Sequence, residues 1–224
     1  MHPGINGPKL KDKPAIIMAG SGDIISHQEL NELSNQGAQL FRSLGLKPGD
    51  SLAFMMENHK LFFPIAFAAY RSGLKYTAIS WRLQASEVEY IVKDCGAKVF
   101  ITSKFLEESA KSLVNSLEGV HKFMLDGITD DFKSYETEIN NMPVTPIDDE
   151  CQGAAMLYSS GTTGKPKGVS REVNLSPLPY KAEEDDLGLT RVVQGLYSAD
   201  EDSVYLSPAP LYHSAPMGFN TGFL

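Results

Sequence analysis

The chain has 224 residues and a mass of 24.5 kDa, which fits one large domain or one and a half ordinary ones. Its 20 Lys and Arg are outnumbered by 28 Asp and Glu, so there is no basic excess to neutralise the phosphates of a nucleic acid. The longest nearly apolar run, residues 61–70, is too short for a membrane span, the N-terminus has no signal-peptide pattern, and the two distant cysteines, Cys95 and Cys151, fit a reduced cytoplasmic protein without structural zinc.

Residues 15–147 are predicted to form a first α/β subdomain. The preceding residues 1–14 are polar and contain three prolines, so we expect them to be disordered. Apolar runs at residues 16–18 and 24–25 flank a Gly-Ser-Gly-Asp turn and predict a short hairpin. Ser26 and Glu29 then form a capping-box pattern that opens a helix, and Gly45 ends that helix.

Helices and strands alternate through the rest of this subdomain. Strands are predicted at residues 52–56, 76–80, 99–102 and 122–125, and helices at residues 61–73, 86–95 and 105–117. A second capping-box pattern, Ser86 with Glu89, opens the middle helix. This alternation is typical of an α/β domain with a mostly parallel sheet flanked by helices. Residues 142–150 contain two prolines and three acids and predict a linker.

A glycine-rich loop follows the linker, within residues 148–224, which are predicted to hold the strand of this loop and the start of a second subdomain. The apolar residues 154–158 predict that strand, and residues 159–169 read SSGTTGKPKGV. Backbone N–H groups in such a loop form an anion nest, hydroxyls donate to phosphate oxygens, and lysines add positive charge. The Walker A and dinucleotide-binding patterns do not fit, because Pro166 follows Lys165 and a glycine is lacking. A solvated surface loop is the alternative interpretation.

The loop closely resembles the signature of a known enzyme family. Residues 158–168 match the pattern [YF]-[ST]-S-G-[ST]-T-G-x-P-K-G of the adenylate-forming superfamily without a gap. That superfamily includes acyl-CoA synthetases, 4-coumarate-CoA-ligase-like enzymes, luciferases and the adenylation domains of peptide synthetases. Residues 45–50 and 208–213 resemble two further blocks of the family. The resemblance implies the N-terminal part of the large adenylate-forming domain, incomplete at its C-terminus.

The resemblance also implies a reaction and its participants. A small carboxylic acid and ATP, accompanied by Mg²⁺, give an acyl-adenylate and pyrophosphate, and CoA then attacks the adenylate. The residues implied to bind the ATP phosphates are Ser159, Ser160, Gly161, Thr162, Thr163, Gly164, Lys165 and Lys167, of which Lys165 occupies the variable position of the pattern. The residues implied to contact the acyl substrate are His213, Tyr212 and Gly218.

Several family segments are expected beyond Leu224, among them the catalytic residues and the carboxylate that binds the metal. We therefore predict no metal ligand in the chain, and we expect it to need the missing C-terminal half of the same protein for full activity. A non-catalytic nucleotide-binding module is the alternative interpretation. Adenylation of an amino acid is disfavoured, because His213 lies where the domains that do so usually carry an Asp. The apolar residues 218–224 are expected to open a buried helix.

Overall fold

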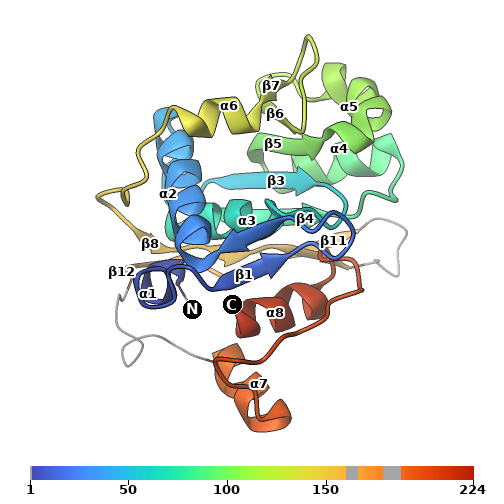
Figure 1. The fold of residues 1–224 in the computed structure, drawn as a ribbon. Coiled ribbons are helices and arrows are strands. Elements are labelled where there is room, and N and C mark those ends of the chain that lie inside the picture. The colour runs from blue at the N-terminus through green and yellow to red at the C-terminus, as the bar shows by residue number, and fades with distance from the viewer. Residues whose placement is uncertain (1, 160–165, 179–187) are drawn as a thin grey trace.

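A parallel sheet forms the centre of the computed structural model, which describes residues 2–159, 166–178 and 188–224. The sheet has six strands in the order β7-β6-β5-β3-β4-β9, all parallel to their neighbours (Figure 1). These strands are β3 (Ser51–Met55), β4 (Lys75–Ile79), β5 (Ala97–Ser103), β6 (His121–Leu125), β7 (Lys133–Ser134) and β9 (Ala154–Ala155). The mostly parallel sheet predicted from the sequence is therefore confirmed.

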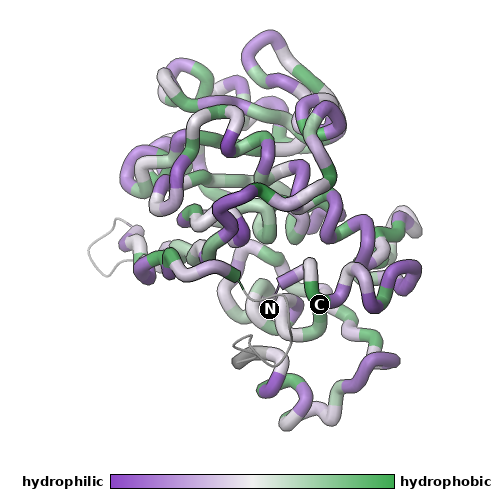
Figure 2. Tube along the Cα trace, turned by 90° about the vertical axis from the view of Figure 1, so that its left-hand side faces the viewer, coloured by the Kyte–Doolittle hydropathy of each residue, from purple (hydrophilic) through white to green (hydrophobic). Residues whose placement is uncertain are grey.

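Helices cover both faces of the sheet, and the sheet separates the core into two parts. The first core contains side chains of α2 (His27–Ser43), α3 (Phe62–Arg71) and α6 (Tyr135–Asn140), and the second contains those of α4 (Ala85–Asp94) and α5 (Glu107–Leu113). Within β3, Leu52 and Phe54 belong to the first core, whereas Ala53 and Met55 belong to the second. A strand buried on both faces is apolar throughout rather than alternating. Figure 2 shows the hydropathy of each residue along the Cα trace, from hydrophilic in purple to hydrophobic in green.

The predicted ends of the first long helix are confirmed. The Ser26 hydroxyl accepts a hydrogen bond from the Glu29 amide at 3.2 Å, and the Glu29 carboxylate accepts one from the Ser26 amide at 2.8 Å. This reciprocal capping satisfies two amides that the first turn of a helix leaves without partners. Gly45 ends the helical region with φ of 82°, a backbone conformation that glycine adopts without steric cost.

Two predicted helices differ from the structure in their bounds. The second capping box was expected at Ser86 and Glu89, but α4 begins at Ala85, and the amide of Gln84 donates to the carboxylate of Glu87 at 2.9 Å. Glu89 instead pairs with Lys93 one turn later. The helix expected over residues 105–117 is regular only in α5, because 3₁₀ turns at Lys104–Leu106 and Val114–Ser116 flank it.

The remaining elements surround the main sheet. The predicted hairpin is confirmed as β1 (Pro14–Ile17) and β2 (Ile24–Ser26), and β8 (Cys151–Gln152) pairs with β12 (Asn174–Pro177). Helices α7 (Gly188–Tyr197) and α8 (Ser214–Phe223) pack against each other at the C-terminal end (Figure 1). A helix is present where residues 218–224 were expected to open one, but α8 begins earlier, at Ser214, and only Met217 and Gly222 in it are buried. The subdomain boundary at 147/148 stays a prediction, and β9, which follows it, joins the main sheet.

The prediction of a disordered N-terminus was wrong. Residues Pro3–Lys9 form α1, whose first turn is capped by the ring of His2, which accepts a hydrogen bond from the Gly4 amide at 3.1 Å. His2 is fully buried. Composition suggested disorder because the segment has few apolar side chains, but polar contacts with distant residues hold it.

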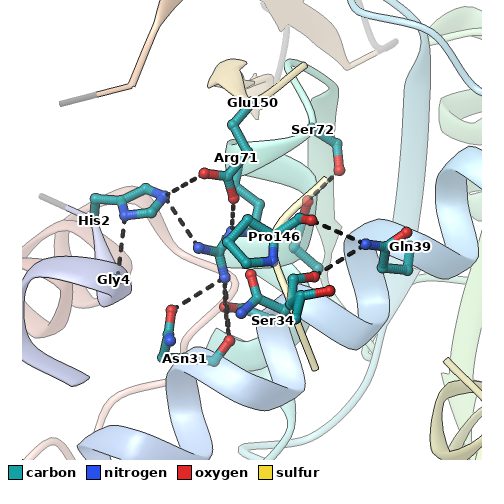
Figure 3. A network of polar contacts seen from close by, with 12 residues as sticks. His2, Gly4, Asn31, Ser34, Gln39, Arg71, Ser72, Pro146 and Glu150 are labelled. Atoms are coloured by element: carbon teal, nitrogen blue, oxygen red, sulfur yellow. Dashed lines mark hydrogen bonds and ion pairs between the residues drawn. The ribbon is translucent and has the colours of Figure 1, made fainter. Parts of the chain in front are cut away.

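Those contacts form a buried network around Arg71, shown in Figure 3. The Arg71 side chain is 0% exposed. Its Nε lies 2.5 Å from a carboxylate oxygen of Glu150, which belongs to the linker. It also donates to the Ser34 hydroxyl at 2.7 Å and to the Asn31 carbonyl at 3.1 Å, both on α2. The ring of His2 lies 3.3 Å from Arg71 and 3.8 Å from Glu150. The network thus joins the N-terminus, two helices and the linker, which residues of one segment alone do not predict.

Acidification is expected to destabilise the protein through His2. Burial, followed by the charge of Arg71, lowers the pKa of His2 from 6.5 to about 3. The unfolded chain therefore binds a proton that the folded chain excludes between pH 6.5 and about 3, so stability falls as the pH falls through that window. We expect the wild type to lose about 2 kcal/mol between pH 7 and pH 5, relative to the variant His2→Asn.

Urea denaturation at the two pH values measures this difference. Asn is the matched replacement because it keeps an acceptor for the Gly4 amide but does not titrate. The other titrating groups, including the buried His27, whose pKa is also lowered by burial, are common to both proteins and cancel. Equal pH dependence in the two proteins would contradict the assignment to His2.

Candidate functional site

The carboxyl ends of the parallel strands lie at one edge of the sheet and carry polar residues. Glu57 and His59 follow β3, Ser103 ends β5, and Asp126 follows β6. The Ser103 hydroxyl donates to Glu57 at 2.6 Å, and His59 Nε2 lies 3.0 Å from a carboxylate oxygen of Asp126. Ligands of open α/β sheets bind outside the carboxyl ends of the strands, so a ligand-binding site is expected here.

The base of the predicted phosphate loop lies beside this sheet. Strand β9 pairs with β4, and the Met156 amide donates to the Tyr76 carbonyl at 2.8 Å. The chain continues into β10 (Leu157–Ser159), which pairs antiparallel with β11 (Lys167–Val169). The single strand predicted for residues 154–158 is thus two short strands. These strands lead into the loop on the side of the sheet where β9 pairs with β4.

Of the predicted phosphate-binding residues, the structure places Ser159 and Lys167. These two are direct partners in the register of β10 and β11, and both are exposed. Directly opposed residues on an antiparallel pair project from the same face, so the side chains of Ser159 and Lys167 leave the hairpin on one face, where the loop begins and ends. The other predicted residues lie outside the described residues: Ser160, Gly161, Thr162, Thr163, Gly164 and Lys165.

Tyr158 holds this hairpin to the rest of the domain, a role that the sequence analysis missed. Its hydroxyl donates to the carboxylate of Asp94, the last residue of α4, at 2.5 Å. Burial and this hydrogen bond raise the pKa of Tyr158, so its hydroxyl stays protonated and able to donate at neutral pH. The tyrosine at the start of the loop pattern was the available signal, but its partner is 64 residues away in the chain.

Replacement of Gly168 by Ala is expected to disturb the hairpin. Gly168 is the register partner of Tyr158, and a Cβ at Gly168 would lie 2.4 Å from the Met156 methyl and 2.9 Å from the Tyr158 ring. The Met156 methyl ends a flexible side chain and can move aside, but the Tyr158 ring is held by Asp94, so the overpacking should cost about 1 kcal/mol, the lower end of the usual range. We expect Gly168→Ala to lower the melting temperature and, on the prediction that Ser159 and Lys167 bind ATP phosphates, to weaken ATP binding about tenfold, since the hairpin that carries both residues would shift.

Thermal unfolding and calorimetric titration with ATP check this expectation. Gly195→Ala is the matched control, because Gly195 lies in helix α7 and has no atom within 4 Å of the added methyl. Alanine in a helix is more stable than glycine, so the control should be neutral or stabilising. Equal behaviour of the two variants would contradict a close fit at Gly168.

The predicted acyl-contacting residues lie around the start of α8. The rings of Tyr212 and His213 have their centroids 4.6 Å apart. Tyr212 is mostly buried, His213 is exposed, and Gly218 is half-buried within α8. His213 is the residue before the first turn of α8, and its carbonyl accepts from the Met217 amide at 3.0 Å. The structure therefore brings Tyr212 and His213 together and leaves Gly218 on the helix that follows.

One group at the carboxyl edge has the composition of a metal site. Ligand atoms of Glu57, His59 and Asp126 all lie within 4.8 Å of one another. His59 Nδ1, however, accepts a hydrogen bond from the Leu61 amide at 3.0 Å, so in the neutral ring the proton is on Nε2, which faces Asp126. A protonated Nε2 has no lone pair for a metal. The hydrogen bonds therefore favour a structural role for this group.

Mg²⁺, which the resemblance implies, finds no ligand set at the base of the loop. The described residues there, Ser159 and Lys167, offer a hydroxyl and an ammonium group. These donors suit phosphate oxygens, whereas Mg²⁺ prefers carboxylate oxygens and water.

In the described part of the chain, no helix is both long and apolar enough to cross a membrane.

Comparisons with known proteins agree with the resemblance of the loop. The family described as AMP-binding enzyme matches residues 6–224. A fatty acid–[acyl-carrier-protein] ligase, ScoC, of Streptomyces coeruleorubidus is 29% identical over 161 residues, covering 70% of this chain and 29% of that protein. A feruloyl-CoA synthase of an Amycolatopsis species is 28% identical over 205 residues, covering 91% of this chain and 38% of that protein. The chain thus spans less than two-fifths of the length of either relative.

A solved structure shows the same fold. The crystal structure of the anthranilate CoA ligase AuaEII in complex with anthranoyl-AMP superposes with a TM-score of 0.76 at 19% identity, covering 99% of this chain and 42% of that one. At this identity the likeness concerns the fold alone. The expected architecture, the N-terminal part of the large adenylate-forming domain, is confirmed.

Proposed function

Because the chain belongs to the AMP-binding enzyme family, we propose that it carries the ATP-binding part of a ligase that activates a carboxylic acid. The product of the first step is an acyl-adenylate, and a thiol, CoA in the form we favour, takes the acyl group in the second step. The observation that carries the proposal is the β10–β11 hairpin, which presents Ser159 and Lys167 together at the edge of the sheet.

The chemistry explains why such a hairpin is needed. A carboxylate is a poor electrophile, and AMP makes one of its oxygens a good leaving group. In the first step a carboxylate oxygen attacks the α-phosphorus of ATP, and the bond to the pyrophosphate oxygen breaks. Negative charge then grows on pyrophosphate, and donors fixed in advance around it lower the barrier. We assign this role to the Lys167 ammonium, the Ser159 hydroxyl and the loop between them, residues 160–165.

The acyl group is assigned to the other part of the site. We propose that Tyr212 and His213 contact the carboxylic acid, with Gly218 nearby on α8. The exposed imidazole of His213 beside the mostly buried Tyr212 ring supports this assignment, because it places a polar group and an aromatic face at one position. The names of the relatives include a fatty-acid ligase and a feruloyl-CoA synthase, so fatty and aromatic acids are the first candidates.

Carboxylate-dependent exchange between ATP and labelled pyrophosphate tests the proposal. The experiment uses the longest natural protein that contains these residues, with Mg²⁺ and panels of fatty, aromatic and amino acids. Exchange with a fatty or aromatic acid is expected, and subsequent transfer to CoA or to an acyl carrier protein identifies the thiol. Exchange with an amino acid alone would replace the proposal by amino-acid activation. ATP binding without any exchange would favour the non-catalytic nucleotide-binding module.

A further inference from the structure

The loop after β3 reaches across to the segment that precedes α8. The side-chain amide of Asn58 donates to the Ala209 carbonyl at 3.0 Å, and its oxygen accepts from the Leu211 amide at 2.9 Å. These partners lie 151 and 153 positions away in the chain. Asn58 therefore binds the backbone immediately before Tyr212 and His213 at two points.

The chemistry of the asparagine side chain fits this contact. The side-chain amide of asparagine carries a donor NH₂ group and an acceptor oxygen in the same plane. It pairs with the carbonyl of one residue and the amide of the residue two positions later, much as a neighbouring strand pairs in a sheet. Among the residues that the structure describes, no strand pairs with the Ala209–Leu211 backbone, so the side chain supplies bonds of the kind that a ladder supplies.

The loop that carries Asn58 is itself fixed on both sides. Glu57 accepts from Ser103 at the end of β5, and His59 contacts Asp126 after β6. The Leu61 amide donates to the ring of His59, which orients that ring from within the loop. The two neighbours of Asn58 are thus held by residues at the ends of β5 and β6. The contacts of Glu57, His59 and Asp126 therefore fix the loop that carries Asn58.

We propose that Asn58 is a positioning residue for the carboxylic-acid side of the site. It acts on Tyr212 and His213 through the backbone that it binds, and it does not touch the substrate. The inference rests on the proposed function, in which these two residues contact the acid. Because the ATP side is built separately, by the β10–β11 hairpin and Tyr158, loss of the Asn58 bonds should affect the acid and leave ATP little changed.

The test compares Asn58→Ala with Asn35→Ala in the longest natural protein. Asn35 is the matched control, because its side-chain amide also donates to a distant backbone carbonyl, that of Val144 at 2.6 Å in the linker. Hydrogen exchange resolved at the Leu211 amide should speed up about tenfold in Asn58→Ala and remain unchanged in Asn35→Ala. In steady-state assays of ATP–pyrophosphate exchange, the KM for the acid should rise about tenfold in Asn58→Ala while the KM for ATP changes less than twofold.

Each outcome decides a different part of the inference. Unchanged exchange at Leu211 in Asn58→Ala would overturn the contact, and equal rises in both KM values would overturn its restriction to the acid. Absence of ATP–pyrophosphate exchange in the wild type would contradict the proposed function, and with it the role of Asn58 in acid binding. This holds for any hydrogen-exchange rate at the Leu211 amide. If Asn58→Ala does not fold, Asn58→Asp serves instead, because it keeps the size and the acceptor for Leu211 but loses the donor to Ala209.

Discussion

Replacement of Lys167 by Ala is expected to reduce ATP–pyrophosphate exchange by about 100-fold or more. Lys167 lies opposite Ser159 where the phosphate loop closes, and its side chain is exposed. Removal of one fixed donor to a developing negative charge typically costs a factor of about 100 to 1,000 in kcat. Because the side chain is exposed, its loss should leave the melting temperature nearly unchanged.

Two control variants separate the local charge from general effects. Lys133→Ala removes an exposed lysine on β7, at the opposite edge of the sheet from β9, and should not change the exchange rate. Lys165→Ala removes the lysine at the variable position of the loop pattern and should have the smaller effect of the two loop lysines. A Lys167→Ala enzyme with wild-type exchange, or with the same loss as Lys133→Ala, would contradict the assignment of Lys167 to the phosphates.

The central sheet could be predicted from the sequence because its signals are local. Each strand from β3 to β6 is a short apolar run bounded by turn residues, and each helix between them carries its own apolar face. The Ser26 capping box was found because both partners lie within one turn. The box at Gln84 and Glu87 was missed because Ser86 and Glu89 fit the same spacing with a residue more common at helix starts.

The N-terminal helix and the supports of the site could not be predicted in the same way. The helix α1 contains Gly and Pro and has little apolar surface of its own, and its capping residue, His2, is held by Arg71 from α3. Tyr158 depends on Asp94, and the segment before Tyr212 depends on Asn58. Each of these pairs joins residues that are far apart in the sequence, so only the tertiary structure brings them together. The motif predicts which residues bind the ligand, but it gives no sign of the distant residues that hold them.

Replacement of Arg71 by Met is expected to cause the largest loss of stability. Arg71 is fully buried, and its removal takes away the ion pair at 2.5 Å from the carboxylate of Glu150, whose side chain is 7% exposed and which also lies 3.8 Å from the His2 ring. Breaking one side of a buried pair costs about 3–5 kcal/mol, because the buried charge loses its cationic partner. This loss is a large part of the total stability of a domain, about 5–15 kcal/mol. For a chain of this size it corresponds to a fall in melting temperature of roughly 10 °C.

Charge removal at the partner distinguishes this mechanism from a simple loss of packing. If the cost comes from the uncompensated carboxylate, the double variant Arg71→Met with Glu150→Gln should be more stable than Arg71→Met alone, as urea denaturation measures. If the cost came from lost packing, the second change would add to the first. Asp149→Asn is the control. Asp149 pairs with Arg42 near the surface, where the Arg42 side chain is 18% exposed and the Asp149 side chain is 56% exposed. Such a pair contributes at most about 1 kcal/mol, so a loss in Asp149→Asn as large as that in Arg71→Met would contradict the importance of burial.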